Sequence, residues 1–147
     1  NRKSPVKGNL YDIFKELTGI YPVLLDSSFT LEIIGINMTE ERLRTKNNVQ
    51  SQNKKRRFKR NWIKVNKKLD EILFTKQFCS KKDYLNLLPS NLCNEFCAKD
   101  LQNELKIDLQ TNTKILIDAH LIIWVFNHME IIEETRIKNR SHYYRVK

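Results

Sequence analysis

The last fifty residues hold the pattern that most limits what this chain can fold into. Residues Ala98–Leu105 carry apolar side chains at helical spacing, and Lys114–Met129 continues that spacing over a longer segment. Two alternating segments follow, Ile131–Ile137 and Ser141–Val146, and they predict two strands joined by a turn at Lys138–Arg140. A short helix, a turn, a long amphipathic helix and a hairpin, in this order, are typical of a winged helix-turn-helix domain.

The predicted hairpin is basic. From Thr135 to the end, the chain contains five Lys or Arg residues and no acid. A basic hairpin behind a long helix is what a wing that contacts nucleic-acid phosphates would look like. We therefore expect nucleic-acid contacts from the hairpin and from the start of the long helix, at Arg136, Lys138, Arg140, Gln110, Asn112 and Lys114.

The net charge of +10 is concentrated in the middle of the chain. Residues 42–73 contain 12 basic and 2 acidic residues, and the segment Arg42–Lys68 contains no acid. Charges packed this closely repel one another, so the segment gains more from an anionic surface than from folding. The alternatives are a solvated loop that keeps the protein in solution and a nuclear-import signal. The densest run adds expected nucleic-acid contacts at Lys54, Lys55, Arg56, Arg57, Lys59 and Arg60.

These patterns predict an α+β fold in three parts. Residues 1–41 form a helix-strand segment, with a helix at Leu10–Leu17, a strand at Phe29–Ile36 and the capped start of a helix at Thr39. Residues 42–61 form a basic linker, in which Thr45–Asn53 is expected to be a flexible loop. Residues 62–147 form the winged helix-turn-helix domain.

The segments that precede Ala98 in the third part predict one strand and two helices. Trp62–Val65 is a short β-prone run, and Asn66 can cap a helix at Lys67–Thr75. Ser80 can cap a second helix at Lys81–Leu88. We expect the early strand to pair with the hairpin and complete its sheet.

The sequence contains no catalytic or metal-binding pattern. Three cysteines without Cys-x-x-Cys spacing indicate reduced thiols in an intracellular, cytoplasmic protein. His120 and His128 lie eight residues apart, whereas zinc ligands on a helix lie three or four apart. A glycine-rich phosphate loop, His-Glu-x-x-His and Gly-x-Ser-x-Gly are all missing from the sequence. We therefore expect a chain without catalysis, cofactor or metal of its own.

The apolar residues of the long helix are expected to form the core of the domain. Trp124 should be buried between this helix and the hairpin, and His120 should be a core or boundary residue. Polar residues interrupt the longest apolar stretch, Lys114–Ile132, so no segment spans a membrane. The chain begins without Met, and we expect it to be a fragment of a longer protein.

The chain resembles the C-terminal half of an uncharacterised family of bacterial proteins. The resemblance rests on the stretches Arg2–Gly8, Leu10–Leu17, Phe29–Ile33, Trp62–Val65, Leu87–Pro89, Glu95–Leu101 and the final hairpin. In that family a nuclease-like region comes first, followed by an Arg-rich segment and a winged helix. The resemblance implies that a nuclease-like region lies upstream and that this chain is the DNA-recognition or regulatory half.

The sequence therefore indicates two candidate functions. In the first, the long helix enters the major groove of double-stranded DNA while the hairpin and the basic run contact phosphates. In the second, the winged helix binds a protein subunit of a larger assembly. The long helix favours the second, because Lys114 is the one certain cation among its outward positions. The clustered charge favours the first.

Overall fold

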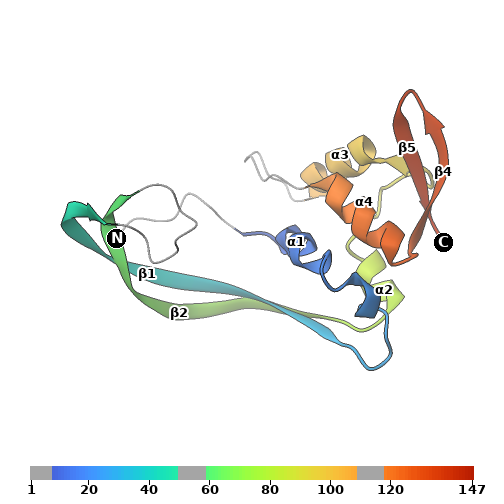
Figure 1. The fold of residues 1–147 in the computed structure, drawn as a ribbon. Helices are drawn as coiled ribbons and strands as arrows, with labels where there is room; N and C mark the ends of the chain where they lie inside the picture. The colour runs from blue at the N-terminus through green and yellow to red at the C-terminus, as the bar shows by residue number, and fades with distance from the viewer. Residues whose placement is uncertain (1–7, 50–58, 109–117) are drawn as a thin grey trace. The chain divides into compact units, whose positions relative to one another are not determined.

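The computed structural model describes residues 8–49, 59–108 and 118–147 (Figure 1). The chain divides into two compact units by its internal contacts. The first unit, residues 1–32 and 77–147, combines helices with a three-stranded sheet, and we call it the α+β unit. The second, residues 33–76, is a long two-stranded sheet that we call the ribbon. The mixed α+β class expected from the sequence is therefore confirmed.

The α+β unit begins with a helical segment that its own polar residues cap. Asn9 Oδ1 accepts a hydrogen bond from the backbone N–H of Tyr11 (2.8 Å), and Asp12 accepts one from the N–H of Asn9 (3.0 Å). Such reciprocal bonds satisfy the N–H groups that a helix start leaves free. They precede the 3-10 helix η1 (Leu10–Ile13) and the helix α1 (Phe14–Leu17), which confirm the predicted helix.

Three further helices follow the ribbon in the described part of the chain. Ser80 and Asp83 form a capping box at the start of α2 (Lys81–Leu85), which ends before the predicted Leu88. Helices α3 (Ala98–Asp108) and α4 (Ala119–His128) lie within or overlap their predicted segments, whereas residues 114–117 of the predicted long helix lie outside the described residues. Among the described helices, none has the length and apolar character needed to cross a membrane.

A small antiparallel sheet holds the C-terminal hairpin. Its strands β3 (Phe96–Cys97), β4 (Ile132–Lys138) and β5 (Ser141–Val146) lie in the order β3-β5-β4. The hairpin confirms the two predicted strands. Its turn residues Asn139 and Arg140 have φ values of 50° and 63°, as in a type I′ turn.

The strand that completes this sheet is not the predicted one. Phe96 pairs with Tyr144 and Cys97 with Tyr143, whereas Trp62–Val65 pairs within the ribbon. The prediction was wrong because a two-residue strand has no alternation that sequence analysis can detect.

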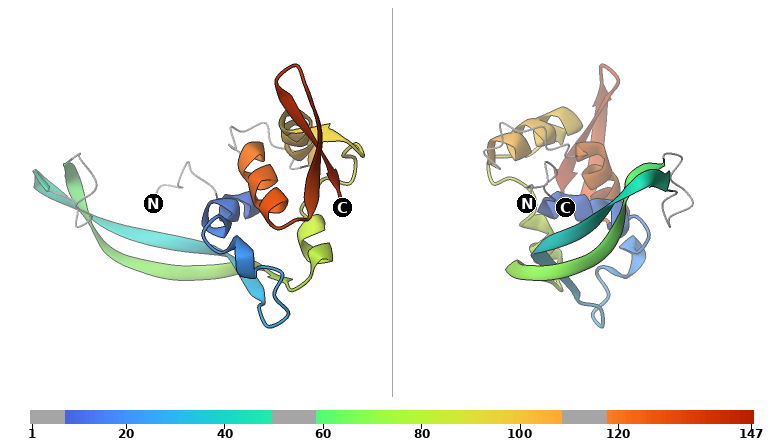
Figure 2. Two further views of the ribbon diagram at one scale, coloured as in Figure 1. Left: turned by 45° about the vertical axis from the view of Figure 1, so that its right-hand side comes forward. Right: turned by 90° about the vertical axis from the view of Figure 1, so that its left-hand side faces the viewer.

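Helix α4 lies at the centre of the α+β unit, where α1, α3 and β4 all contact it (Figure 2). Phe14 of α1 meets Phe126 of α4 edge to face, with ring centroids 5.3 Å apart, and both rings are buried. Leu101 and Leu105 of α3 are fully buried in the same core. This packing explains why so apolar a helix is stable in the unit.

Trp124 is not buried as expected. Its side chain is 39% exposed, and His120 one turn earlier is exposed as well. Ile122, Val125 and Phe126 take the inward side of α4, and the advance of 100° per residue turns Trp124 outward.

The ribbon consists of β1 (Leu31–Val49) and β2 (Arg60–Phe78), each 19 residues long. Contacts between the strands join Glu32 to Gln77, and Thr39 to Asp70. The residue numbers of the partners decrease along β2 as they increase along β1, so the two strands are antiparallel. At about 3.3 Å per residue, each strand is about 60 Å long, several times the usual length.

The ribbon corrects several sequence expectations. The predicted helix at Lys67–Thr75 and the predicted helix start at Thr39 are wrong, because both lie in strands. Residues 45–49 of the expected loop belong to β1, as do residues 42–49 of the expected linker. An amphipathic helix of nine residues would need a core to bury its apolar side, whereas pairing with β1 satisfies the backbone directly.

Candidate nucleic-acid interface

The half of the ribbon that contains the end of β1 and the start of β2, which we call the distal half, has cations on one of its faces. Alternation along residues 60–64 of β2 places Arg60, Trp62 and Lys64 on one face of the strand. Arg42 of β1 contacts this face through Trp62, and alternation places Arg44 on the same side of β1 as Arg42. We call this surface the basic face, formed by Arg42, Arg44, Arg60, Trp62 and Lys64.

Two guanidinium groups lie over the ring of Trp62. The Cζ atoms of Arg42 and Arg60 are 4.1 and 4.7 Å from the ring centroid. Attraction between a cation and the face of an indole holds an exposed arginine in place. Arginines held in this way lose less conformational entropy when they bind a further anion.

Glu40 forms ion pairs with two cations of the basic face, Arg42 and Lys64. Its carboxylate accepts hydrogen bonds from Arg42 Nε (2.6 Å) and Lys64 Nζ (2.5 Å). The bonds to Lys64 and Arg42 lower the pKa of Glu40 to about 2. Glu40 is thus ionised at neutral pH and positions both cations, and from Arg42 to Lys68 the chain contains no acid that could neutralise the rest.

The cations on the strands of the C-terminal hairpin are paired with acids. Arg136 forms an ion pair with Glu95 at 2.5 Å and lies over the ring of Tyr143. Arg145 forms another with Glu133 at 2.6 Å. Arg136 and Arg145 thus each have an acid of their own, whereas Arg42 and Lys64 of the basic face share Glu40.

The tip of the same hairpin differs from its strands. Lys138 ends β4 and Arg140 lies in the turn, and both are exposed. Within the described part of the chain, neither side chain makes an ion pair. The structure therefore leaves two of the three predicted hairpin cations, Lys138 and Arg140, open to a ligand.

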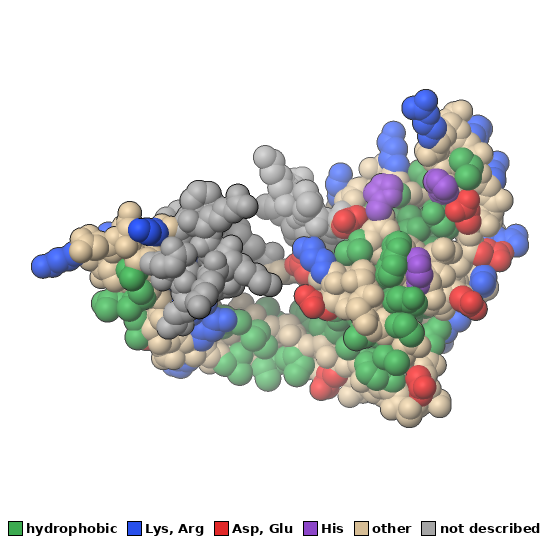
Figure 3. Space-filling view, in the orientation of Figure 1, with side chains coloured by type: hydrophobic (Ala, Val, Ile, Leu, Met, Phe, Trp, Pro, Cys, Tyr) green, Lys and Arg blue, Asp and Glu red, His purple; other side chains and the backbone are tan. Residues whose placement is uncertain are grey.

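The outward side of α4 is aromatic. The rings of Trp124 and His128 stack with centroids 3.8 Å apart, and Tyr21 meets both edge to face at 5.4 and 5.2 Å. His128 Nδ1 lies 2.8 Å from the carbonyl oxygen of Trp124, so this nitrogen donates. The segment Ala119–His128 contains no Lys or Arg, and Figure 3 shows hydrophobic side chains and histidines together on the visible face of this unit.

Several predicted contacts cannot be placed. Seven of them lie outside the described residues: Lys54, Lys55, Arg56, Arg57, Gln110, Asn112 and Lys114. Lys59 directly precedes β2, and Arg60 is the first residue of β2 and joins the basic face. Sequence analysis missed Arg42, Trp62 and Lys64. The predicted strand Trp62–Val65 was the signal that could have identified two of them, because Trp62 and Lys64 lie on one face of such a strand.

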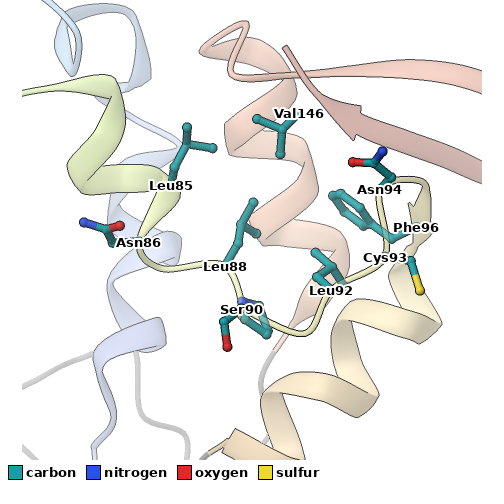
Figure 4. Close-up of a pocket in the computed structure, with 10 residues that line it drawn as sticks. Leu85, Asn86, Leu88, Ser90, Leu92, Cys93, Asn94, Phe96 and Val146 are labelled. Carbon is teal, nitrogen blue, oxygen red and sulfur yellow. The ribbon is translucent and has the colours of Figure 1, made fainter.

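A hollow of about 440 Å³ lies at the surface of the α+β unit (Figure 4). Leu85 and Leu88 line it from the α2 side, and Phe96 and Val146 line it from the sheet. Cys93 and Ser90 are among the ten described residues of its wall, which include no acid and no base. The described wall of the hollow is therefore mainly apolar and offers no pair of side chains for general acid–base catalysis.

Comparison with known proteins gives a match to a family model. A family model described as "Domain of unknown function (DUF8091)" matches residues 1–79, which include α1 and the whole ribbon. No curated protein and no solved structure matches the chain.

Proposed function

This chain belongs to the DUF8091 family, and we propose that it binds double-stranded DNA through the basic face of the ribbon. The observation that carries the proposal is the stack of Arg42 and Arg60 on Trp62, within a segment that contains no acid. Clustered and positioned cations suit the phosphates of a nucleic acid, because neutralising them releases condensed counterions.

The shape of the ribbon favours DNA over RNA. The major groove of B-form DNA is about 12 Å wide and admits a two-stranded ribbon. The major groove of A-form RNA is too narrow for side chains to enter. The distal ribbon thus has a shape and a charge that suit duplex DNA.

The α+β unit supplies a second, smaller contact in this proposal. Its helices α3 and α4, its sheet order β3-β5-β4 and the β4–β5 hairpin support a winged-helix topology. Lys138 and Arg140 at the hairpin tip then contact phosphates of the same nucleic acid. The resemblance to a family with a nuclease-like region supports a role for the chain as the recognition or regulatory part of a larger protein.

The salt dependence of binding tests the proposal. Fluorescence anisotropy with a labelled 20-base-pair duplex, between 50 and 200 mM salt, should give a log–log slope of about −5 if roughly six phosphates are neutralised. The triple variant Arg42→Gln, Arg60→Gln, Lys64→Gln should make this slope less steep by about 2.7. An RNA duplex of the same sequence should bind more weakly.

A matched control removes the same charge elsewhere. Lys15→Gln, Lys99→Gln and Lys106→Gln change three exposed lysines of the α+β unit and should leave the slope unchanged. Equal slopes for the two triple variants would contradict the proposal, as would a parent chain that binds no DNA at 50 mM salt.

A protein subunit is the second candidate partner, and the aromatic side of α4 favours it. Tyr21, Trp124 and His128 offer ring surface and no cation, which suits a protein more than a phosphate backbone. Trp124→Ala should therefore leave DNA affinity within about twofold of the parent. A tenfold loss would instead assign α4 to DNA recognition.

A further inference from the structure

The 3-10 helix η2 (Tyr21–Val23) carries exposed apolar side chains beside α4. Tyr21 contacts α4 through the rings of Trp124 and His128. The N–H of Val23 donates to the carbonyl of Ile20 (3.1 Å), which closes one turn, and residues three apart lie on the same side of a 3-10 helix. Ile20 and Val23 are 37% and 42% exposed on that side. Both are within two residues of Tyr21, so they lie next to the aromatic rings.

The exposed side of α4 is a ridge of three rings. His120, Trp124 and His128 follow one another at intervals of four residues, and all three are exposed. Side chains spaced by four form a ridge along a helix, and such a ridge packs between the ridges of a second helix. We define the aromatic patch as these three residues together with Ile20, Tyr21 and Val23. A continuous apolar surface of this kind indicates an interaction site.

Acids flank both segments that form the aromatic patch, and no cation lies between them. Glu16 and Asp26 flank the segment that contains η2, and Asp118 and Glu130 flank α4. Residues 16–26 and residues 118–130 contain neither Lys nor Arg. Figure 3 shows acidic side chains beside the hydrophobic side chains and histidines of this unit. The charge around the aromatic patch is therefore negative.

The four flanking acids differ from the acids around the C-terminal sheet. Within the described part of the chain, none of the four forms an ion pair. Glu95, Glu133 and Glu134, in contrast, each lie within 3.0 Å of an Arg or His side chain. Lys15 directly precedes the first of the two segments, but it pairs with Asp12 (3.4 Å). The four carboxylates are thus available to the cations of a partner.

We propose that the aromatic patch binds a basic amphipathic helix of a partner protein. The apolar side of that helix, with side chains at positions i, i+3 or i+4 and i+7, covers the ridge of α4 and the side chains of η2. Lysines and arginines beside the apolar side meet the four carboxylates. This charge complementarity selects a cationic partner over a neutral or acidic one.

The same charges disfavour two other occupants. A second copy related by a two-fold axis would set the acids of one chain against the same acids of the other. A DNA groove would set them against phosphates, because Asp118 and Glu130 stand at the two ends of α4. The inference goes beyond the proposed DNA contact and does not rest on it, since it concerns α4 and η2 and not the ribbon.

The fluorescence of Trp124 tests binding at the aromatic patch. The chain contains two tryptophans, so Trp62→Phe leaves Trp124 as the sole one. The probe is a synthetic peptide of about 18 residues, five helical turns, with leucines on one side and lysines on the other. Its binding should shift Trp124 emission to shorter wavelength, because the leucines displace water from the indole. The same peptide with glutamates in place of lysines should bind at least about tenfold more weakly.

A triple variant tests the role of the carboxylates. Glu16→Gln, Asp26→Asn and Glu130→Gln together should weaken binding of the lysine peptide about tenfold, since three exposed ion pairs are lost. Asp118 is kept, because its carboxylate accepts a hydrogen bond from the N–H of Leu121 (3.1 Å) at the start of α4.

The matched control removes the same charge from the same unit. Glu95→Gln, Glu133→Gln and Glu134→Gln together should keep the affinity within about twofold of the parent, because these acids have cations of their own. Circular dichroism shows whether both triple variants fold. Ile20→Ser with Val23→Ser changes no charge and should also weaken peptide binding, so it tests the patch even if a triple variant fails to fold.

Any of four results would overturn the inference. Trp124 emission that does not change at about 100 µM lysine peptide, or that the glutamate peptide shifts equally, would exclude a basic helix. Equal losses of affinity for the two triple variants would exclude the flanking acids from the contact. A shift caused by duplex DNA and not by the peptide would assign α4 to DNA. A shift that follows the concentration of the chain alone would assign the patch to a second copy. The salt slope of DNA binding is measured separately, so the two proposals fail independently.

Discussion

The ring of Phe74 lies directly over the α-carbon of Gly35 across the ribbon, where a methyl group at position 35 would overlap the ring. Glycine normally weakens a strand, so replacing it with alanine usually stabilises. Here Gly35→Ala should instead destabilise the ribbon by about 1 kcal/mol, because Phe74 must leave its place. Hydrogen exchange of β1 amides measures this, since it reports the ribbon separately from the α+β unit.

A second variant isolates the cause. Gly35→Ala combined with Phe74→Leu removes the overlap and should regain most of the lost protection. Slower exchange in Gly35→Ala alone would mean that the ring does not restrict position 35.

Neighbouring aromatic residues of α4 should differ in their effect on stability. Phe126 is fully buried against Phe14, so Phe126→Ala should cost about 3 to 5 kcal/mol. Trp124 lies on the outward side, and Trp124→Ala should cost about 1 kcal/mol or less. Urea denaturation monitored by circular dichroism gives both values. Similar losses for the two variants would contradict the orientation of α4.

The hairpin tip should show a conflict between stability and binding. Arg140 has a φ of 63°, which costs a side-chain-bearing residue about 1 kcal/mol and costs glycine nothing. Arg140→Gly should therefore raise the urea midpoint while lowering DNA affinity through the lost cation. Asn139→Gly is the control, since asparagine tolerates a positive φ, and neither property should change much. An Arg140→Gly variant with unchanged DNA affinity would exclude the tip from the DNA contact.

Glu40 should titrate far below an ordinary glutamate. Its pKa of about 2 in the folded ribbon lies below the unfolded value of 4.5, so its stabilising ion pairs are complete above pH 4.5. They are lost as the pH falls through about 2. An NMR titration of the Trp62 indole, which lies beside Arg42, should therefore change near pH 2.

Removing Lys64, one of the two cations paired with Glu40, should raise the midpoint of the Glu40 titration. Lys64→Gln deletes the largest cause of the lowered pKa, so the Glu40 titration should shift upward towards 4.5. A midpoint that stays near 2 in Lys64→Gln would mean that Arg42 alone holds the carboxylate.

Local signals in the sequence were enough for most of the α+β unit. Asn9, Ser80 and the apolar spacing of α3 act within a few residues, so their helices follow from the sequence alone. The β4–β5 hairpin also depends on neighbouring residues, with Asn139 at its turn. The run of cations identified Lys59 and Arg60 for the same reason, since charge density is a property of the sequence.

Tertiary structure decided the ribbon and the basic face. Leu69, Ile72 and Leu73 fit the spacing of a helix as well as a strand, and only pairing with β1 selects the strand. Arg42 and Trp62 are twenty residues apart, and their contact exists because the strands are antiparallel. The sequence by itself determined where charge and apolar side chains occur, whereas long-range backbone pairing determined which of them share a surface.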